Sequence, residues 1–443
     1  MQQELRTFQM QGGGFTRVQR IVPGNWHRLR FFSPEPDAEA FSQITGLYRD
    51  FIVPRYRWLY AKLAFFRLPR DIRVPDVPGM EIADPLLRAT LILRYGMRLY
   101  HATPRFSSPA AEALWHTLAS RGCTAIVPGL RPGTVILPVG AELGFLTRSE
   151  TTARLRANLG FFTMDRIDCM TAFDRLGTPL GLRVQNGKIV APPLFGREAL
   201  LVRNNGDIRI SKPDLTDLTL TAAGKEFVPG KNAALFSRPS CRKTPPGRGT
   251  ELVIVHDTVL AVTEGGGTPV PSSGFVLRTD DAEGIRPGDR VSYHGLEDVR
   301  FGVQCGNAAV ENGVPVLGFR SPFWNIRRPF GPSYPPSLYP LDYKRDRAPR
   351  MLLGADKCGE PVLLWFEGRP KFGDDPETES RGASLSEVAS IAAKLGVVCG
   401  VNLDGGGSAQ ILTREGRALR VSDRDPSDHS ERERAVPEGL CVL

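Results

Sequence analysis

Apolar residues recur with helical spacing in three segments near the start of the chain. These segments are DAEAFSQITGLYRDFIV (37–53), RYRWLYAKLAFFRL (55–68) and LLRATLILRYGMRLY (86–100), and proline-rich breaks separate them. Apolar residues three and four positions apart form one apolar stripe along a helix. The pattern therefore predicts a helical N-terminal region over residues 1–115.

Over residues 116–443 the pattern changes to short apolar runs that turn residues separate. Runs such as ALLVRNNGDIRI (199–210) and RMLLGAD (350–356) predict strands bounded by Gly, Asn and Asp. One segment, SLSEVASIAAKLG (384–396), predicts an amphipathic helix with Gly396 at its C-terminal end. The expected fold class is therefore α+β: a sheet-rich mixed domain with few helices, preceded by the helical N-terminal region.

Composition places the chain among folded globular proteins. Hydrophobic residues make up 41% and charged residues 24% of its 443 residues. The N-terminal sequence lacks the apolar run of a signal peptide, and no stretch approaches the roughly 18 apolar residues of a membrane span. As written, the chain is expected in the cytoplasm. Seven scattered cysteines without metal-binding spacing indicate reduced, mostly buried thiols, and neither a metal nor a cofactor is expected.

The formal charge of +9 favours anionic partners in general. The chain carries no nucleic-acid recognition motif, so nucleic acid is an unlikely partner. Basic and aromatic residues at 55–70 are compatible with a weak contact to an anionic membrane surface, although a helix packed on the main domain explains them better. The oligomeric state stays open.

Two local motifs suggest chemistry. In the stretch Asn402 to Ser408 (NLDGGGS), three glycines lack Cβ atoms, so backbone N–H groups can approach an anion closely, and Asp404 stands at a strand end. A plain hairpin turn between two strands is the commoner explanation of such a loop. Ser384 and Glu387 fit an N-terminal capping box, which alone accounts for both residues. Alternatively, the carboxylate of Glu387 faces a cleft.

Several further motifs occur in a fixed order between residues 158 and 436. They are Asn158-Leu159-Gly160-Phe161-Phe162, Pro179-Leu180-Gly181 with Asn186-Gly187-Lys188, Pro349-Arg350 with Gly354, Glu367-Gly368-Arg369, Ser380 and Gly382 with Leu385 and Glu387, NLDGGGS at 402–408, and Glu433-Arg434-Ala435-Val436. From about residue 120 onward, this order and spacing resemble the phosphodiester glycosidase family. Met351 replaces the usual Thr, Ala409 stands where a second Ser or Thr is common, and the usual export signal is absent. Because members are often exported, the compartment stays open.

The resemblance implies a hydrolase that cleaves the sugar C1–O bond of a glycosyl-1-phosphodiester, from a bacterial glycan or a phosphoglycosyl conjugate. Arg350 and the glycine amides would hold the phosphate, Asp404 would orient a sugar hydroxyl or act at C1, and Glu387 would be a second carboxylate or only a cap. The implied catalytic residues are Asp404, Glu387 and Arg350, and the implied substrate-binding residues are Asn158, Gly405, Gly406, Gly407 and Ser408. The alternative is a catalytically inactive carbohydrate-binding or sugar-phosphate-binding protein of the same fold, which Met351 and Ala409 favour.

Overall fold

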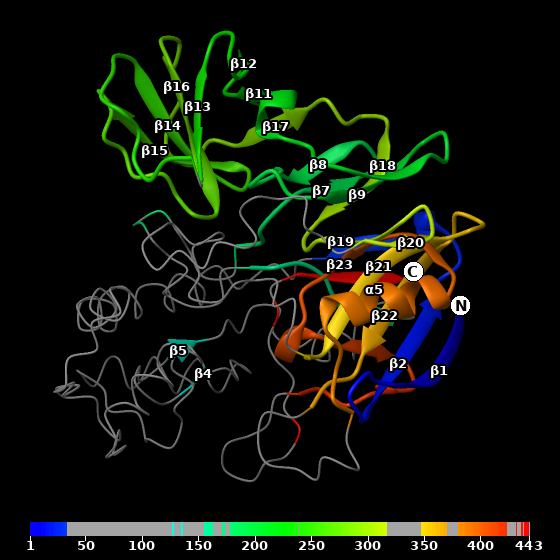
Figure 1. Cartoon of the computed structure of the whole chain (residues 1–443). Helices are drawn as coiled ribbons and strands as arrows, with labels where there is room; N and C mark the ends of the chain where they lie inside the picture. Colours follow the sequence, from blue (N-terminus) through cyan, green and yellow to red (C-terminus); the bar gives the residue numbers. More distant parts are fainter. Residues whose placement is uncertain are drawn as a thin grey trace, which may run out of the picture.

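The computed structural model describes nearly three fifths of the chain. The described residues are 1–32, 155–162, 171, 173, 178–238, 240–316, 347–369, 380–422, 431, 436 and 438–442, with the backbone of two short paired strands, β4 (Ile126–Val127) and β5 (Thr134–Val135). Antiparallel sheets dominate these residues, and among them only α5 (Leu385–Lys394) is an α-helix (Figure 1). The prediction of a sheet-rich domain with few helices is confirmed for this part of the chain.

The largest sheet has seven antiparallel strands. In spatial order they are β1 (Gln2–Gln9), β2 (Phe15–Val22), β22 (Pro361–Phe366), β21 (Arg350–Asp356), β23 (Val397–Asn402), β19 (Ala308–Glu311) and β20 (Val314–Pro315). Leu352 and Leu364 are fully buried in the central strands, and both belong to the apolar cluster that α5 shares with this sheet. The helix therefore packs on one face of the seven-stranded sheet.

The prediction of a helical N-terminal region is wrong for the part that the structure describes. Residues 1–32 form β1, β2, a 3₁₀ turn (Trp26–Arg28) and β3 (Leu29–Phe32). Strand β2 (FTRVQRIV) lies between β1 and β22, and five of its eight residues are buried. Its apolar and polar residues do not alternate, so pairing with both neighbours accounts for the strand better than a local pattern does. The three segments that carried the helical prediction, the membrane-contact segment 55–70 and the boundary at 115 all lie outside the described residues.

A second sheet places strands from opposite ends of the chain side by side. Its order is β24 (Ile411–Thr413), β6 (Leu155–Asn158), β25 (Gly439–Val442) and β3. We call this sheet, the seven-stranded sheet and α5 together the site region. Leu155 and Leu440 of the second sheet share an apolar core with Leu353 and Trp365 of the first. Side chains from both sheets therefore build one continuous interior.

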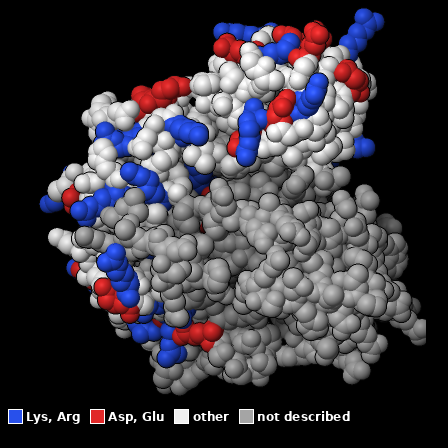
Figure 2. Space-filling view, turned by 180° about the vertical axis from the view of Figure 1, so that it is seen from behind, with Lys and Arg blue, Asp and Glu red and all other residues white. Residues whose placement is uncertain are grey.

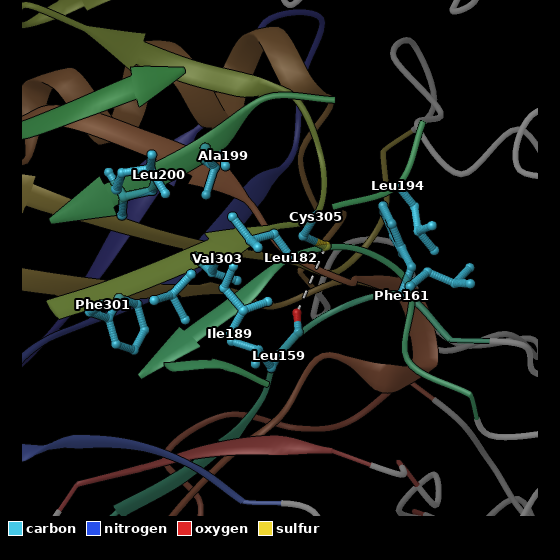
Figure 3. Packing of buried hydrophobic residues seen from close by; sticks show 14 of the residues in the cluster. Leu159, Phe161, Leu182, Ile189, Leu194, Ala199, Leu200, Phe301, Val303 and Cys305 are labelled. Carbon is cyan, nitrogen blue, oxygen red and sulfur yellow. Dashed lines mark hydrogen bonds between the residues drawn. The ribbon is translucent and has the colours of Figure 1, made fainter. Parts of the chain in front are cut away.

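A five-stranded sheet lies between the site region and the sheets at the top of Figure 1. Its order is β10 (Ile208–Ser211), β9 (Ala199–Arg203), β18 (Val299–Gln304), β7 (Arg183–Gln185) and β8 (Lys188–Ala191). Leu182, Leu200 and Val303 lie in its buried interior, next to Leu159 and Cys305 (Figure 3). This packing joins the middle sheet to the same core.

The remaining described strands form what we call the distal region, residues 215–294. It contains a four-stranded sheet, β13 (Ala234–Ser237), β16 (Gly274–Thr279), β14 (Thr250–Val255) and β15 (Thr258–Glu264), and a three-stranded sheet, β12 (Lys225–Phe227), β11 (Thr219–Ala222) and β17 (Val291–His294), beside a 3₁₀ turn (Leu215–Asp217). Two of the pairings, β11 with β12 and β14 with β15, join consecutive strands, and the other three join strands farther apart within this region.

The predicted helix is confirmed together with both of its end signals. The Ser384 side chain accepts a hydrogen bond from the backbone N–H of Glu387, and the Glu387 side chain accepts one from the Ser384 N–H, which completes the capping box. At the other end Gly396 has φ +85°, a conformation that favours glycine. Local sequence alone therefore determines where α5 begins and ends.

On the face that Figure 2 shows, Lys and Arg side chains lie among Asp and Glu over the described surface. No helix among the described residues is long and apolar enough to cross a membrane. Nor do these residues contain a group of three or more His, Cys, Asp or Glu side chains placed to hold a metal ion.

Candidate active site

The glycine-rich loop does not close a hairpin. It leaves β23 in the seven-stranded sheet, forms a 3₁₀ turn at Gly406–Ser408, and enters β24, which pairs with β6 in the second sheet. The hairpin interpretation of DGGG is therefore wrong. The loop instead crosses from one sheet to the other, with Asp404 at the crossing.

Asn158 holds both ends of this loop. Its amide Nδ2 donates a hydrogen bond to the carbonyl of Asp404 at 2.7 Å, and its Oδ1 accepts one from the N–H of Gln410 at 3.0 Å. The N–H of Asp404 donates to the carbonyl of Leu159 at 3.0 Å. Because Asn158 is only 1% exposed, these bonds give it a structural role at the loop, whereas the resemblance implied a substrate contact.

Arg350 lies on the other side of the loop, at the first position of β21. Its Nε donates to the carbonyl of Ala383 at 3.1 Å, and the side chain is 4% exposed. A Cβ atom on Gly405 would lie 2.7 Å from the carbonyl oxygen of Pro349 and 3.5 Å from Cδ of Arg350. Only glycine therefore allows the loop to approach the backbone of Pro349, next to this arginine, so closely.

The glycine amides do not all have the role that the sequence suggested. The N–H of Gly406 donates to the carbonyl of Pro349 at 2.9 Å, so it is not available to an anion. Among the described residues, the N–H groups of Gly405 and Gly407 have no hydrogen-bond acceptor. The backbone of Gly406 therefore holds the loop against β21. Because Gly407 is buried, the amide of Gly405 is the remaining candidate for a phosphate contact.

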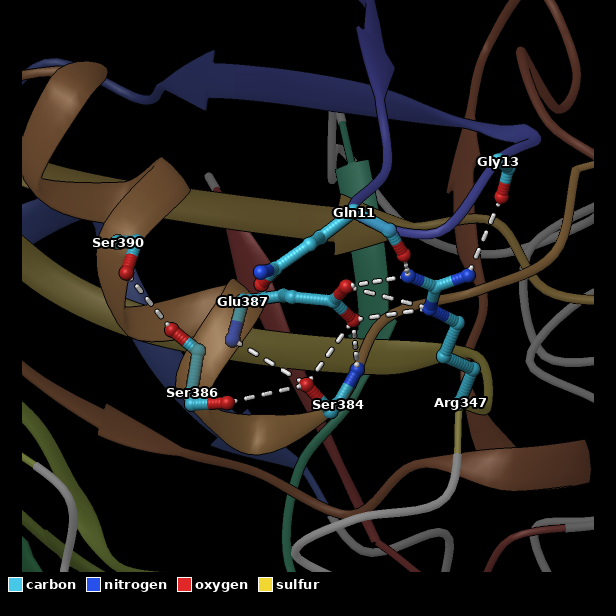
Figure 4. A network of polar contacts seen from close by, with 7 residues as sticks. All are labelled: Gln11, Gly13, Arg347, Ser384, Ser386, Glu387 and Ser390. Carbon is cyan, nitrogen blue, oxygen red and sulfur yellow. Dashed lines mark hydrogen bonds and ion pairs between the residues drawn. The ribbon is translucent and has the colours of Figure 1, made fainter.

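Glu387 faces Arg347 rather than the glycine loop. Nη2 of Arg347 donates to Oε1 of Glu387 at 2.6 Å and Nε donates to Oε2 at 3.1 Å, while the Ser384 hydroxyl also donates to Oε2 at 2.9 Å (Figure 4). Burial raises the pKa of Glu387, but the hydrogen bonds from Arg347 and Ser384 and the charge of Arg347 outweigh it, so the pKa lies below its ordinary value. A carboxylate with this environment stays ionised near neutral pH, which suits a cap and an ion pair better than a proton donor.

The structure thus brings most of the predicted site residues together around one loop. Asn158 contacts the loop at both ends, Arg350 lies beside Gly405, and Asp404, Gly405 and Gly406 remain half-buried. Gly407 and Ser408 are buried, and Phe161 and Phe162 belong to the interior. The accessible groups of the loop are therefore those of residues 404–406.

Two charged residues buried behind the site could not be recognised as important from the sequence. The guanidinium of Arg183 forms a buried ion pair with the carboxylate of Glu438, directly behind Gly160. Arg183 also donates from Nη1 to the carbonyl of Gln304. A Cβ atom on Gly160 would collide with the guanidinium of Arg183, so the glycine two residues after Asn158 is required by this pair. Neither charged residue lies in a recognisable motif, because their partners are distant in the sequence.

Cys305 is also buried beside the site. Its thiol lies 4.0 Å from the carbonyl oxygen of Leu159 (Figure 3). Burial is the main cause that raises its pKa strongly; the nearby charges of Arg183 and Arg197 lower it, and that of Asp404 raises it. The thiol therefore stays protonated near neutral pH and is no candidate nucleophile.

Comparison with known proteins decides the family. Residues 246–443 match the family model described as phosphodiester glycosidase. These residues belong to the phosphodiester glycosidase family. The phosphodiester glycosidase match contains Arg350, Glu387 and the whole glycine loop, whereas Asn158 precedes it. The resemblance inferred from the motifs is confirmed for the matched residues.

Two curated relatives match a shorter stretch. The N-acetylglucosamine-1-phosphodiester alpha-N-acetylglucosaminidases of Bos taurus and Homo sapiens are each 36% identical to this chain over 93 residues. The match covers 21% of this chain and spans 16% of the length of each relative. Phosphodiester glycosidase membership therefore describes a domain, and the activity of the whole protein is a proposal.

Three solved structures are also similar. A hypothetical protein from Synechocystis has a TM-score of 0.41 at 15% identity, covering 99% of this chain and 61% of that one, and a putative exported protein from Burkholderia pseudomallei has 0.42 at 18%, covering 100% and 96%. The zebrafish N-acetylglucosamine-1-phosphodiester alpha-N-acetylglucosaminidase catalytic domain, auto-inhibited by its pro-peptide, has 0.26 at 15%, covering 56% and 88%.

Proposed function

We propose that the protein hydrolyses the sugar C1–O bond of a glycosyl-1-phosphodiester. The observation that carries the proposal is the arrangement inside the family-matched residues, where Arg350 lies against Gly405 and next to the half-buried Asp404. A guanidinium beside the amide of Gly405, in the half-buried part of the loop, suits a phosphate, and a neighbouring carboxylate suits a sugar. A bacterial glycan or a phosphoglycosyl conjugate is the proposed source of substrate.

The chemistry of such a substrate explains why few groups are needed. The departing phosphate monoester has a second pKa of about 6, so it leaves near neutral pH with little protonation. Its charge grows from one negative charge towards two as the C1–O bond breaks. Arg350 would stabilise that growing charge, while Asp404 would stabilise the positive charge that develops at C1, or orient a sugar hydroxyl. Glu387 has no proton-transfer role in this proposal because Arg347 and Ser384 hold its carboxylate.

The two departures from the family pattern lie in the interior. Met351 and Ala409 are each 0% exposed and belong to the apolar core. Their side chains therefore change the packing rather than remove a polar group from the accessible part of the loop. This location weakens the alternative, a catalytically inactive sugar-phosphate-binding protein.

The test measures reducing sugar released from a panel of glycosyl-1-phosphodiesters of α and β configuration. We expect turnover by the wild type, a loss of about 10²- to 10³-fold in Arg350→Ala, and a comparable loss in Asp404→Asn, since each removes a charge that stabilises the transition state. Arg203→Ala is the matched control, because Arg203 pairs with Asp298 in the middle sheet, away from the loop. Near-wild-type turnover in both site variants would refute the site, and binding of sugar phosphates without any turnover would select the inactive alternative.

A further inference from the structure

The turn between β1 and β2 presents two backbone carbonyls to Arg347. Gly12, Gly13 and Gly14 have φ of +79°, +92° and +79°, which a non-glycine residue adopts only with strain. In this conformation the carbonyls of Gln11 and Gly13 accept hydrogen bonds from Nη2 and Nη1 of Arg347 (Figure 4). The N-terminal turn therefore binds a side chain that is more than 330 residues away in the sequence.

The same guanidinium holds the start of α5. Arg347 contacts both carboxylate oxygens of Glu387, and Glu387 in turn accepts hydrogen bonds from the N–H and the hydroxyl of Ser384. The hydrogen bond to Glu387 raises the pKa of Arg347. One arginine fork thus links three chain segments that have no sequence proximity: the N-terminal turn, the approach to β21 and the first turn of α5.

The short peptide from Arg347 to Arg350 connects the contacts of Arg347 to the candidate active site. Ala348 and Ala383 exchange backbone hydrogen bonds of 3.3 and 3.0 Å, Pro349 accepts the N–H of Gly406, and Arg350 donates to the carbonyl of Ala383. The peptide is therefore held between α5 and the glycine loop. A shift of Arg347 would move the backbone from which the side chain of Arg350 extends.

We propose that Arg347 and Glu387 are positioning residues of the candidate active site, and that the carbonyls of Gln11 and Gly13 complete the support. This inference rests on the proposed hydrolysis of a glycosyl-1-phosphodiester. The pair acts through Arg350 and touches no substrate itself. Because the phosphate gains charge as the bond breaks, a misplaced Arg350 affects the transition state more than the bound substrate. The loss should therefore fall on kcat more than on KM.

Two variants separate positioning from helix capping. Glu387→Gln removes the ion pair with Arg347 but keeps a side chain that completes the capping box, whereas Ser384→Ala removes the cap and leaves the ion pair. We expect Glu387→Gln and Arg347→Met to lower kcat by about 10- to 100-fold with little change in KM, since small misplacements near reacting groups have effects of this size. Ser384→Ala should keep kcat within about threefold of the wild type. Arg347→Lys keeps the positive charge but lacks the planar guanidinium, so its kcat should lie between those of the wild type and Arg347→Met.

Hydrogen exchange supplies a readout that needs no substrate. In folded Arg347→Met, the amides of Gly406 and Ala348 should exchange faster than in the wild type, while those of β14 in the distal region keep their protection. Unchanged exchange at both amides overturns the inference, as does an unchanged kcat in Arg347→Met when the wild type is active. If the wild type hydrolyses none of the glycosyl-1-phosphodiesters, the proposed function is refuted, and so is the role of Arg347 and Glu387 in catalysis. Faster amide exchange in Arg347→Met would then show only that the contacts of Arg347 stabilise the backbone at Ala348 and Gly406.

Discussion

Polar contacts within the site region join residues that are far apart in the sequence, whereas those within the distal region join residues that are closer in the sequence. In the site region, hydrogen bonds and ion pairs join residues hundreds of positions apart, such as Asn158 with Asp404 and Arg183 with Glu438. In the distal region the corresponding pairs are near neighbours: Arg278 contacts Glu251 at a separation of 27 residues and Thr244 contacts Glu251 at 7. The candidate active site thus depends on the complete fold, whereas the distal region depends mainly on strand pairs within residues 215–294.

The largest expected effect comes from the buried ion pair behind Gly160. Arg183→Met leaves the Glu438 carboxylate buried without its cation, which should lower the free energy of unfolding by about 3–5 kcal/mol. Arg278→Met in the distal region is the matched variant. It should lower the free energy less, because Arg278 is more exposed and Glu251 keeps the hydroxyl of Thr244. Urea denaturation followed by fluorescence measures both.

The hydrolytic activity of the same two variants tests this comparison further. At a temperature where both variants are folded, Arg278→Met should hydrolyse the substrate like the wild type, and Arg183→Met should not. Equal stability losses with equal activities would mean that the two regions do not differ in the way proposed.

Two asparagines offer a second comparison with a smaller effect. Asn158 joins β6 to the glycine-rich loop, whereas Asn232 bridges its own loop, accepting from the N–H of Val228 at 2.7 Å and donating to the carbonyl of Glu226 at 2.8 Å. Asn158→Ala removes the side-chain partner of the partly buried Asp404 carbonyl and of the buried Gln410 N–H, and should cost about 1–3 kcal/mol. Asn232→Ala exposes its partners to water and should cost well under 1 kcal/mol. Thermal unfolding measures the difference, and a larger loss for Asn232→Ala would contradict the comparison.

The smallest effect concerns acid stability in the distal region. Burial raises the pKa of Asp257, but the hydrogen bonds from His256 and Thr258 and the charges of His256 and Arg290 outweigh it and hold the pKa at about 2. Because the folded pKa lies below the ordinary value of 3.8, ionised Asp257 stabilises the fold above pH 4, and this contribution disappears as the pH falls towards 2.

The carboxylate is partly exposed, so the contribution should be about 1 kcal/mol after screening by solvent. Urea midpoints of the wild type and Asp257→Asn should differ at pH 6 and converge as the pH falls from 4 to 2. A difference that stays constant over this range would show that Asp257 is not the group responsible.

Local sequence predicted the elements whose causes are local. The helix at Leu385–Lys394 was predicted with its cap and its glycine end, and the runs at 199–210 and 350–356 form strands. The strand β2 was missed, because the helical spacing of segments farther along dominated the interpretation of the whole N-terminal region. Apolar and polar residues do not alternate along FTRVQRIV, so no local pattern indicated a strand, and its partner β22 lies too far away to be inferred from it.

The candidate site was predicted in its residue types but not in its geometry. The motifs placed Arg350, Asp404 and the glycines in the site, and the structure gathers them. No local pattern indicated that DGGG crosses between sheets, because that depends on β24 pairing with β6 instead of β23. Arg347 was missed for the same reason, since its three partners lie at positions 11, 13 and 387.

The pairing of β3 with β25 has a consequence for how the protein is made. Residues 29–32 are synthesised more than 400 residues before their partner at 439–442. At typical rates of translation this interval is on the order of tens of seconds. During that time the nascent polypeptide carries an unsatisfied strand edge, so chaperone occupancy of this segment should persist until the partner strand has emerged.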